Sequence, residues 1–309
     1  GLGFPYFDAE DNLADVVAKS PFDKPDLICV GHGWLKDSPG EEVNQYPHIN
    51  LAASSLPKVL ILNKEYTNLE AKLNYIVEQK IDLVFTHHHE INKYRKATGV
   101  EFVFWPFAVN HKKFKDYGLE KIYDLTFTGV LRNPSLPETQ TDLRIRVQSE
   151  IFYTIGEIKF FIKPKYKQYN IFWQGQPSSK IMSAISKWIN PMTRLPANEY
   201  CKHLNKSKIC FNTLSPMDLI STRYYEAMAS KCMVFCQRSH LYKGLFEEGK
   251  HYISFDEDLS DFQEKLIFYL ENKDRRSSII HSAYDHVMKN HTWQIRIEEF
   301  TNQVLKISK

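Results

Sequence analysis

Short apolar segments alternate with segments of helical periodicity along most of this chain, and that alternation limits the fold more than any other feature. In the N-terminal part we expect strands at residues 26–31, 58–62, 81–86 and 101–105. Between the second and third of these strands, Leu69, Leu73, Ile76 and Val77 recur at helical spacing, which gives a crossover helix one apolar stripe. Strands joined by crossover helices form a parallel sheet with helices on its faces, so we predict an α/β fold.

The length of the chain and a second series of strands indicate two domains. A chain of 309 residues exceeds the usual size of one compact core. Periodicity is lost in the polar stretch 110–118. A second series then follows, with strands at 124–129, 159–162, 171–174, 209–212 and 232–236 and helices over 138–154, 198–206 and 222–230. We predict Rossmann-like domains over residues 1–118 and 119–292 that face a cleft, and a C-terminal helix over 293–309 that crosses back to the first domain.

The composition excludes several classes of protein. The sequence is 43% hydrophobic and 25% charged with no low-complexity tract, as in ordinary globular proteins. The net charge is only +3 and the basic residues do not cluster, so we expect no nucleic-acid partner. The longest apolar run, residues 102–109, is too short to cross a bilayer, and no secretory segment opens the sequence. We expect a soluble protein, and a peripheral contact with a membrane is left open.

The cysteines indicate a reducing compartment. The sequence holds five of them, an odd number. Cys232 and Cys236 lie in an apolar, strand-like run, where residues four apart are about 13 Å from each other, beyond the reach of a disulfide. We therefore expect the cytoplasm. Because the chain begins with Gly1 rather than Met, we also expect a piece of a longer, multidomain chain.

The segment most informative about function, residues 212–222, joins a predicted strand to a predicted helix. Ligands of open α/β sheets bind beyond the carboxyl ends of the strands, and the N–H groups of a helix N-terminus suit a diphosphate. Ser221 or Thr222 can cap this helix. Arg223 follows in the first turn, where a cation opposes the helix dipole, and this placement indicates an anionic partner.

Glu226 lies three residues after Arg223 and faces the same side of the helix. An exposed ion pair between them would contribute only about 0.2–0.5 kcal/mol. A capping box does not fit, because the residue three positions after the cap is Tyr224 or Tyr225. The carboxylate can instead accept hydrogen bonds from both hydroxyls of a ribose.

These residues carry a resemblance to a known family. Asp218 and Glu226 enclose seven residues, and the stretch 226–229 reads Glu-Ala-Met-Ala. This pattern resembles the acid-x7-Glu signature of group-one glycosyltransferases with the GT-B fold. Residues 223–227 read Arg-Tyr-Tyr-Glu-Ala, which is similar to the Arg-x-x-Glu-Ala pattern of CgeB-like glycosyltransferases. The resemblance extends in order through residues 104–109, 127–132, 246–250 and 290–296.

Two departures accompany this resemblance, which covers the C-terminal two thirds of the chain well and the first hundred residues loosely. The first acid of the signature is Asp218 rather than Glu, and Ser230 and Lys231 stand where the family usually has a glycine.

The resemblance implies an enzyme without metal or cofactor that moves a sugar from a nucleotide diphospho-sugar to a hydroxyl of a glycan or glycoconjugate. The donor would bind the second domain and the acceptor the first. Fixed cations should meet the charge of the leaving diphosphate. Arg132, just after the predicted Gly129 turn, and Arg223 suit this role; Lys163 does too, although it could equally lie on the solvated face of a strand. The predicted donor-binding residues are Gly129, Arg132, Lys163, Asp218, Ser221, Thr222, Arg223 and Glu226.

Candidates for catalysis lie in the first domain. His32 and His88 follow predicted strands, and each could contact the donor sugar, accept a proton from the acceptor, or be an ordinary hydrogen-bonded loop histidine. Asp8, in the opening loop, is a third candidate base. The run from His87 to His89 does not predict a metal site, because successive strand residues point to opposite faces.

Two other functions are compatible with the same residues. One is a sugar-nucleotide epimerase of similar architecture, and the other is a non-catalytic GT-B module that binds sugar. The donor nucleotide, the sugar, the acceptor, the oligomeric state and the choice between retention and inversion depend on pocket shape and loops that the sequence does not define.

Overall fold

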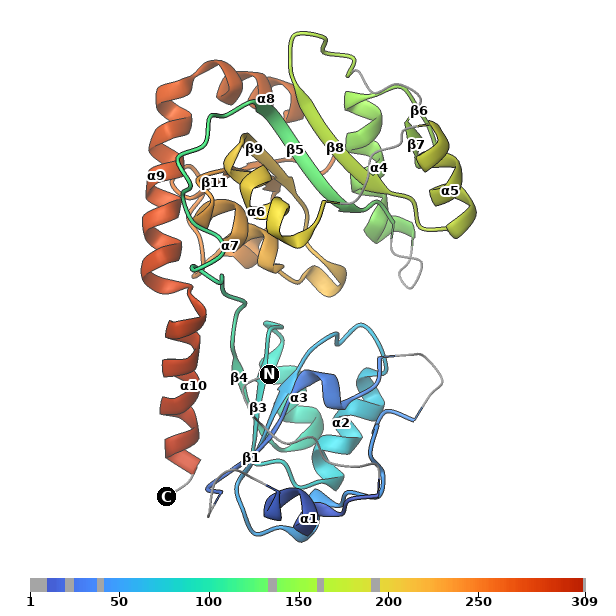
Figure 1. Cartoon of the computed structure of the whole chain (residues 1–309), viewed down its shortest axis with the longest axis vertical. Coiled ribbons are helices and arrows are strands. Elements are labelled where there is room, and N and C mark those ends of the chain that lie inside the picture. The colour runs from blue at the N-terminus through green and yellow to red at the C-terminus, as the bar shows by residue number, and fades with distance from the viewer. Residues whose placement is uncertain are drawn as a thin grey trace. The chain divides into compact units, whose positions relative to one another are not determined.

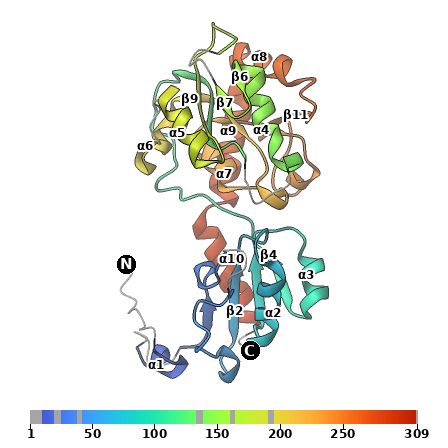
Figure 2. The ribbon, with the colours of Figure 1, turned by 90° about the vertical axis from the view of Figure 1, so that its right-hand side faces the viewer.

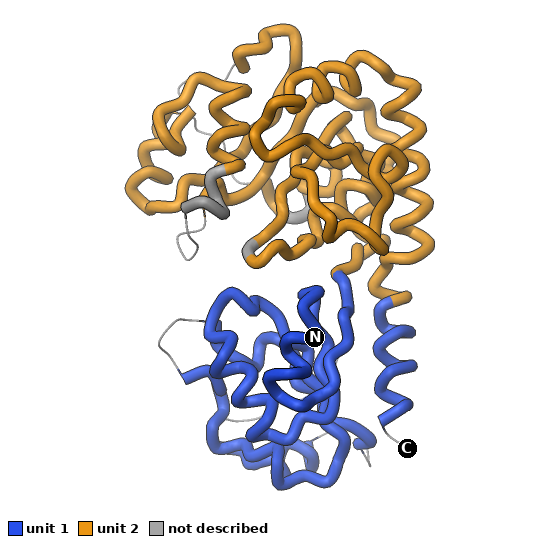
Figure 3. Tube along the Cα trace, turned by 180° about the vertical axis from the view of Figure 1, so that it is seen from behind, with its two compact units in different colours: residues 1–106, 296–309 blue, residues 107–295 orange. Residues whose placement is uncertain are grey.

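The computed structural model describes residues 10–19, 25–37, 42–132, 138–159, 164–189 and 195–307. The chain forms two compact units, which are distinguished by colour in Figure 3. Unit 1 comprises Gly1–Pro106 together with Arg296–Lys309, and unit 2 comprises Phe107–Ile295.

Unit 1 is built on a parallel four-stranded sheet in the order β1-β2-β3-β4. Its strands are β1 (Ile28–Val30), β2 (Lys58–Leu62), β3 (Leu83–Thr86) and β4 (Glu101–Phe104). Leu62 at the end of β2 pairs with Thr86 at the end of β3, which in turn pairs with Phe104. The loops that follow these strands therefore leave from one edge of the sheet.

Helices cover both faces of the unit 1 sheet, as Figures 1 and 2 show. The helices are α1 (Leu13–Ala18), α2 (Leu69–Glu78), α3 (Ile91–Thr98) and the part of α10 (Trp293–Ile307) that begins at Arg296, with 3-10 turns at His32–Trp34 and Leu51–Ala53. Neighbouring side chains of β3 point to opposite faces of the sheet. Val84 packs in the cluster that contains Ile76 of α2, whereas the ring of Phe85 lies 4.7 Å from that of Phe300 on α10.

Two hydrogen bonds hold α10 to the end of the first sheet. The Arg296 Nε donates to the Pro106 carbonyl at 2.8 Å, and the Trp105 Nε1 donates to the Arg296 carbonyl at 3.1 Å. Arg296 is only 2% exposed, so the guanidinium is a structural part of unit 1.

Unit 2 contains a parallel five-stranded sheet in the order β11-β10-β9-β5-β8. The strands are β5 (Tyr123–Val130), β8 (Ile171–Gln176), β9 (Ser207–Asn212), β10 (Met233–Gln237) and β11 (Tyr252–Phe255). The helices are α4 (Glu138–Ile151), α5 (Lys180–Ile189), α6 (Ala197–Asn205), α7 (Thr222–Ala229), α8 (Phe262–Glu271) and α9 (Lys273–Asn290), with 3-10 turns at Pro216–Asp218 and His240–Tyr242. Numbered along the chain, this sheet has the order second-first-third-fourth-fifth, a doubly wound order.

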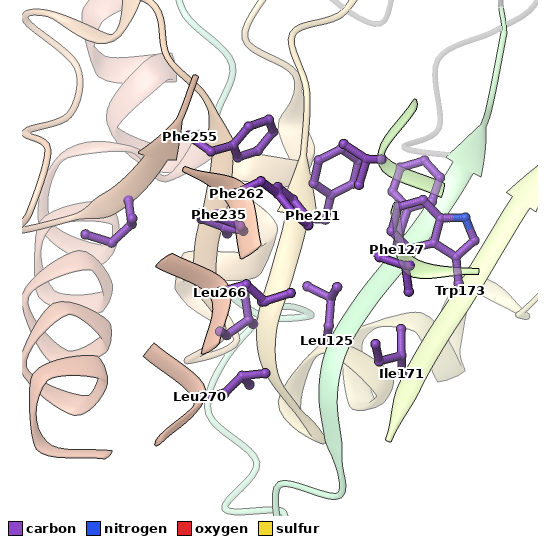
Figure 4. Close-up of a cluster of buried hydrophobic side chains, with 14 of the residues drawn as sticks. Leu125, Phe127, Ile171, Trp173, Phe211, Phe235, Phe255, Phe262, Leu266 and Leu270 are labelled. Atoms are coloured by element: carbon purple, nitrogen blue, oxygen red, sulfur yellow. The ribbon is translucent and has the colours of Figure 1, made fainter. Parts of the chain in front are cut away.

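Strand alternation divides the core of unit 2 into two layers. Phe127, Phe211 and Phe235 point to the face covered by α4 and α8, where Figure 4 shows the aromatic cluster that they form. Cys210 and Val234, from the intervening positions, point to the face covered by α6, α7 and α9. Both faces of the sheet are buried, which confirms the predicted α/β class with Rossmann-like domains.

Two local features differ from the sequence prediction. The helix predicted to reach residue 154 ends at Ile151, because the chain turns there into an antiparallel hairpin of β6 (Thr154–Ile155) and β7 (Ile158–Lys159). The helix α5 has no counterpart among the predicted elements. Residues 160–163, where the predicted strand would continue, lie outside the described residues.

The polar stretch expected to be a linker packs on unit 2. Val109 and Phe114 are buried in the cluster that includes Tyr225. The Val109 backbone N–H donates to the His291 carbonyl at 2.9 Å. Only a few apolar side chains, which stand among lysines and asparagines, anchor this segment to unit 2. Because they do not recur at a regular spacing, the sequence gave no sign that the segment packs.

Candidate functional site

The strand order of unit 2 creates a topological switch point beside β5. From β5 the chain crosses to β8 on one side and then returns to β9 on the other. Connections that leave in opposite directions open a crevice beyond the carboxyl ends of the two strands, and ligands of doubly wound sheets bind there.

A pocket of about 610 Å³ occupies this place. Its walls come from the ends of β5 and β8, from α6 and from the start of α7. The lining residues are Thr128, Gly129, Val130, Gln174, Gln176, Leu195, Pro196, Tyr200, Thr222, Arg223 and Glu226. The volume suits a small organic ligand. Of the residues predicted from the sequence, the pocket brings together Gly129, Thr222, Arg223 and Glu226.

Arg223 reaches from the first turn of α7 to the end of β5. A Cβ atom added to Gly129 would lie 2.6 Å from the Arg223 Nη1 and 3.2 Å from its Cζ, so the guanidinium rests against the bare glycine backbone. The missing side chain of Gly129 therefore lets the Arg223 guanidinium approach the backbone closely. The sequence had instead suggested that this glycine forms a turn. The Arg223 cation lies beside the N-terminal turn of α7, and a cation next to the positive end of a helix dipole attracts anions.

Glu226 lines the same pocket one turn further along α7. Burial raises the pKa of its carboxyl group, while the Arg223 charge and a hydrogen bond from the Thr222 hydroxyl act in the opposite direction. Its position in the pocket wall differs from that of the exposed helix-surface pair considered above. A half-buried carboxylate beside a cation can accept hydrogen bonds from ligand hydroxyls.

Arg144 of α4 supports the site and was not among the residues predicted from the sequence. Its Nε donates to the Thr213 hydroxyl at 2.6 Å and its Nη1 to the Val130 carbonyl at 2.7 Å. Burial and the neighbouring Arg223 charge lower the pKa of Arg144 to about 10, so it remains a cation at neutral pH. It fastens the end of β5 to the loop that leads into α7. No periodicity or motif marked this arginine in the sequence.

Tyr200 and Gln174 are further members of the site that sequence reasoning missed. Tyr200 projects from α6, and its hydroxyl forms a hydrogen bond with Thr128. Burial raises the pKa of Tyr200 well above its usual range, and the Glu226 charge adds to this effect. Gln174 precedes the end of β8 and also lines the pocket. Both are ordinary residues of predicted elements, and only the strand order reveals that they meet.

Arg132, Asp218 and Ser221, which were also predicted to bind the donor, are not among the described residues that line the pocket. Arg132 lies with its Nε 3.4 Å from the Glu157 Oε1. Asp218 is exposed in a left-handed conformation at φ +59°. Ser221 occupies the N-cap position of α7, but its side chain makes no capping hydrogen bond. Lys163 lies outside the described residues. A binding role for these residues stays a prediction.

The histidines predicted to act in catalysis belong to unit 1. His32 is exposed in the turn after β1, and His88 is buried after β3, where its Nδ1 accepts a hydrogen bond from the Glu90 N–H at 3.2 Å. Both follow strands whose carboxyl ends share one edge of the sheet. Their catalytic roles stay predictions, and Asp8 lies outside the described residues.

The neighbouring His87 is held in the core of unit 1 by contacts with Trp105. Its Nδ1 lies 2.6 Å from the Trp105 carbonyl, and its ring stacks on the indole of the same residue. Burial lowers the pKa of His87 to about 4, so the imidazole is neutral and Nδ1 carries the donated proton.

The described residues contain neither a metal-binding cluster nor a membrane-spanning helix. In these parts of the chain, no three His, Cys, Asp or Glu side chains are grouped so that they could hold a metal ion. The helices within the described ranges are also all too short or too polar to span a membrane.

Comparisons with known proteins agree with this geometry. Residues 167–302, a little under half of the chain, match a family described as glycosyl transferase-like. This range contains α7 with Arg223 and Glu226. The chain has the GT-B glycosyltransferase fold. None of the curated protein sequences compared with it matches.

Three solved structures show the same fold at low sequence identity. TarM is 14% identical with a TM-score of 0.57, and the alignment covers 84% of this chain and 51% of TarM. HepE of Anabaena in complex with UDP and glucose is 8% identical with a TM-score of 0.58, covering 81% of this chain and 72% of HepE. Sucrose-phosphate synthase of Thermosynechococcus elongatus is 9% identical with a TM-score of 0.59, covering 91% and 73%. The chain thus spans about half the length of TarM.

Proposed function

We propose that this protein is a glycosyltransferase that moves a sugar from a nucleotide diphospho-sugar, bound in the pocket of unit 2, to a hydroxyl of a glycan or glycoconjugate. The observation that carries the proposal is the convergence of Arg223 and Glu226 on one pocket at the switch point of the sheet. This segment also lies within the glycosyl transferase-like match. The Arg-x-x-Glu-Ala pattern of residues 223–227 further supports a CgeB-like subfamily.

Each proposed role follows from the chemistry of sugar transfer. Glu226 accepts hydrogen bonds from the two ribose hydroxyls of the donor, which fixes the nucleoside. Arg223 and the N-terminal N–H groups of α7 face the diphosphate. When the bond between the anomeric carbon and the diphosphate oxygen breaks, negative charge grows on that oxygen, and these fixed donors stabilise it. The acceptor oxygen bonds to the anomeric carbon and gives its proton to a base, for which His32, His88 and Asp8 are the candidates.

Arg223 can stabilise the negative charge on the leaving diphosphate, a task that a metal ion performs in other enzymes. We therefore propose that the reaction needs neither metal nor cofactor. The five free thiols are compatible with a cytoplasmic location, which we also propose. The structures of TarM and HepE in complexes contain UDP, so uridine nucleotides are the first ligands to test.

Calorimetric titration with a panel of nucleoside diphosphates and nucleotide sugars tests the donor site. We expect binding of at least one nucleotide, and we expect Glu226→Ala to weaken it by roughly a hundredfold, as for the loss of charge-assisted hydrogen bonds. Glu264→Ala, at an exposed site on α8, is the matched control and should leave the affinity unchanged. If no nucleotide or nucleotide sugar binds, the proposal is wrong.

Turnover is tested by release of the nucleoside diphosphate with and without an acceptor. Transfer predicts release that depends on the acceptor and persists in EDTA. Conversion of the nucleotide sugar into an epimer would favour the alternative enzyme, and binding without any turnover would favour a non-catalytic module.

A further inference from the structure

Helix α5 of unit 2 is amphipathic, but its most apolar side chains face solvent. Trp188 is 86% exposed, Ile181 is 74% exposed and Ile185 is 39% exposed, and none of the residues of the helix is buried. These three positions follow one another at spacings of four and three residues, so they form a single stripe on one side of the helix. A surface helix of a globular protein normally turns such a stripe to the core. Here the half-buried residues are Met182, Ser183, Ser186 and Ile189, on the adjoining side.

The helix is held in this orientation by ordinary contacts with its neighbours. The Ser179 hydroxyl accepts a hydrogen bond from the Met182 N–H at 3.0 Å and so caps the first turn. Just before it, the Ser178 N–H donates to the Glu157 carboxylate at 2.6 Å, which ties the start of α5 to the turn of the β6–β7 hairpin. The exposed stripe therefore belongs to an anchored element.

The hairpin beside α5 adds another exposed apolar side chain. Ile155, next to the hairpin turn, is 71% exposed, and α5 packs against β7 of the same hairpin. Figure 1 shows the two elements side by side. Large side chains exposed together on adjacent elements mark an interaction surface more strongly than a single exposed residue does.

The charges on α5 itself are basic, while the acid at its start, Glu157, is engaged with Ser178. Lys180 and Lys187 are exposed, and both lie on the same flank of the apolar stripe when the sequence is placed on a helix of 3.6 residues per turn. The segment Lys-Ile-Met-Ser-Ala-Ile-Ser-Lys-Trp-Ile over residues 180–189 contains no acidic residue. Lysine is depleted in protein–protein interfaces, whereas tryptophan beside lysine is characteristic of helices that lie at a membrane surface.

We propose that α5, assisted by Ile155, is a docking surface for a lipid bilayer that contains anionic lipids. Trp188, Ile181 and Ile185 enter the boundary between headgroups and acyl chains, and the helix lies parallel to the bilayer plane. The ammonium groups of Lys180 and Lys187 extend to lipid phosphates, while their methylene chains cover the apolar boundary. This surface gives the peripheral membrane contact that the composition left open, and it does not depend on the proposed enzymatic activity.

Sedimentation of the whole protein with vesicles tests this docking. We expect binding to vesicles of phosphatidylcholine mixed with phosphatidylglycerol, weaker binding to pure phosphatidylcholine, and release at high salt. Transfer of Trp188 into the bilayer should move the tryptophan emission to shorter wavelength. Ile181→Ser combined with Trp188→Ser should lower the vesicle partition coefficient by roughly tenfold or more.

Two variants separate the contributions and control for folding. Lys180→Gln with Lys187→Gln should remove the preference for anionic vesicles while the stripe is intact. Phe268→Ser, at an exposed aromatic residue of α8, should bind vesicles as the parent does. All of the exchanged side chains are solvent-exposed, and circular dichroism verifies that the variants stay folded.

Three outcomes would overturn the membrane proposal. One is an absence of binding by the parent to either kind of vesicle, and another is equal binding by the parent and the Ile181→Ser, Trp188→Ser variant. The third is a concentration-dependent dimer of the parent, seen by light scattering and abolished in that same variant, which would assign the stripe to a second copy of the chain.

Discussion

Gly129 leaves the space at the end of β5 that the Arg223 guanidinium fills. A Cβ at this position would lie 2.6 Å from Nη1, so Gly129→Ala forces the guanidinium to move. That group is the far end of a flexible side chain and can give way, but the backbone at residue 129 has φ +159°, which residues with a side chain rarely adopt. We therefore expect Gly129→Ala to lower the free energy of unfolding by about 1–2 kcal/mol. The affinity for a nucleoside diphosphate should fall by about tenfold, since the displaced cation no longer faces the diphosphate.

Calorimetric titration of Gly129→Ala measures this loss. Gly33→Ala is a fitting control, because an added Cβ there meets no atom within 4 Å. Unchanged affinity in Gly129→Ala would show that the guanidinium position does not matter for binding.

The ionisation of Glu226 should control donor binding at mildly acidic pH. Burial raises the pKa of this carboxyl group from the ordinary value of 4.5, and the Arg223 charge only partly opposes the effect. Since the ionised carboxylate accepts the ribose hydrogen bonds, affinity should be complete above the raised pKa and should decrease as the pH falls through it. Titrations with nucleotide at a series of pH values give the profile. Glu226→Gln should bind weakly and without this dependence; a profile shared with the parent would assign the titration to another group.

At the residue scale, the sequence identified the parts of the site that form one local segment. Arg223 and Glu226 lie on one helix, so their spacing and the cost of a cation in the first turn could be evaluated from the sequence. Tyr200 and Arg144 reach the same place from α6 and α4, and their proximity depends on tertiary packing. Arg132 was predicted as a phosphate ligand because it follows the Gly129 position; that role stays a prediction, and the Arg132–Glu157 ion pair involves a hairpin that the sequence did not predict.

The contact between α4 and the rest of the site depends on the forked guanidinium group of Arg144, which binds several acceptors at once. The guanidinium donates to the Thr213 hydroxyl, to the Val130 carbonyl and, at 3.4 Å, to the Leu214 carbonyl. Arg144→Met keeps the apolar stem but leaves these acceptors without their donor. We expect the free energy of unfolding to fall by about 2 kcal/mol, and donor affinity to fall because the loop into α7 is released.

Urea denaturation followed by circular dichroism gives the stability of the Arg144 variants. Arg144→Lys retains the charge without the fork and should be intermediate. Arg146→Met changes an exposed arginine of the same helix, whose Nη1 donates to the Glu257 carbonyl at 2.7 Å, and because water can replace this exposed donor the change should cost about 0.5 kcal/mol. Equal losses for Arg144→Met and Arg146→Met would argue against the fork.

At the element scale, strands were easier to predict than short helices. The strand at residues 58–62 agrees with β2, because buried parallel strands are continuous apolar runs. The helix α5 was missed, since ten residues give few turns over which a 3.6-residue period can be recognised. The β6–β7 hairpin consists of two-residue strands, too short for alternation to be visible.

The whole molecule should lose stability in one acidic range, because both units bury neutral histidines. Burial lowers the pKa of His87 in unit 1 to about 4. In unit 2, burial lowers the pKa of His203 and of His251 to about 4 as well. The Lys206 charge lowers the pKa of His203 further, and the His286 charge lowers that of His251 further. Each of these histidines binds a proton near pH 6.5 in the unfolded chain but only near pH 4 in the folded one. The unfolded state therefore binds more protons between these values, and stability is complete above the upper value and decreases toward the lower.

The loss approaches on the order of 3 kcal/mol for the deeply buried His87 and His203 and is smaller for His251, whose charge solvent screens. It should be visible in the urea midpoint measured across this pH range. His203→Gln isolates one contribution. The His203 Nε2 lies 2.6 Å from the Thr126 hydroxyl, and an amide can replace this hydrogen bond without a titrating group. We expect this variant to lose part of the pH dependence, whereas His281→Gln, at an exposed histidine of α9, should keep all of it. A pH dependence that is the same in all three proteins would mean that carboxyl groups, rather than buried imidazoles, determine the acid stability of the fold.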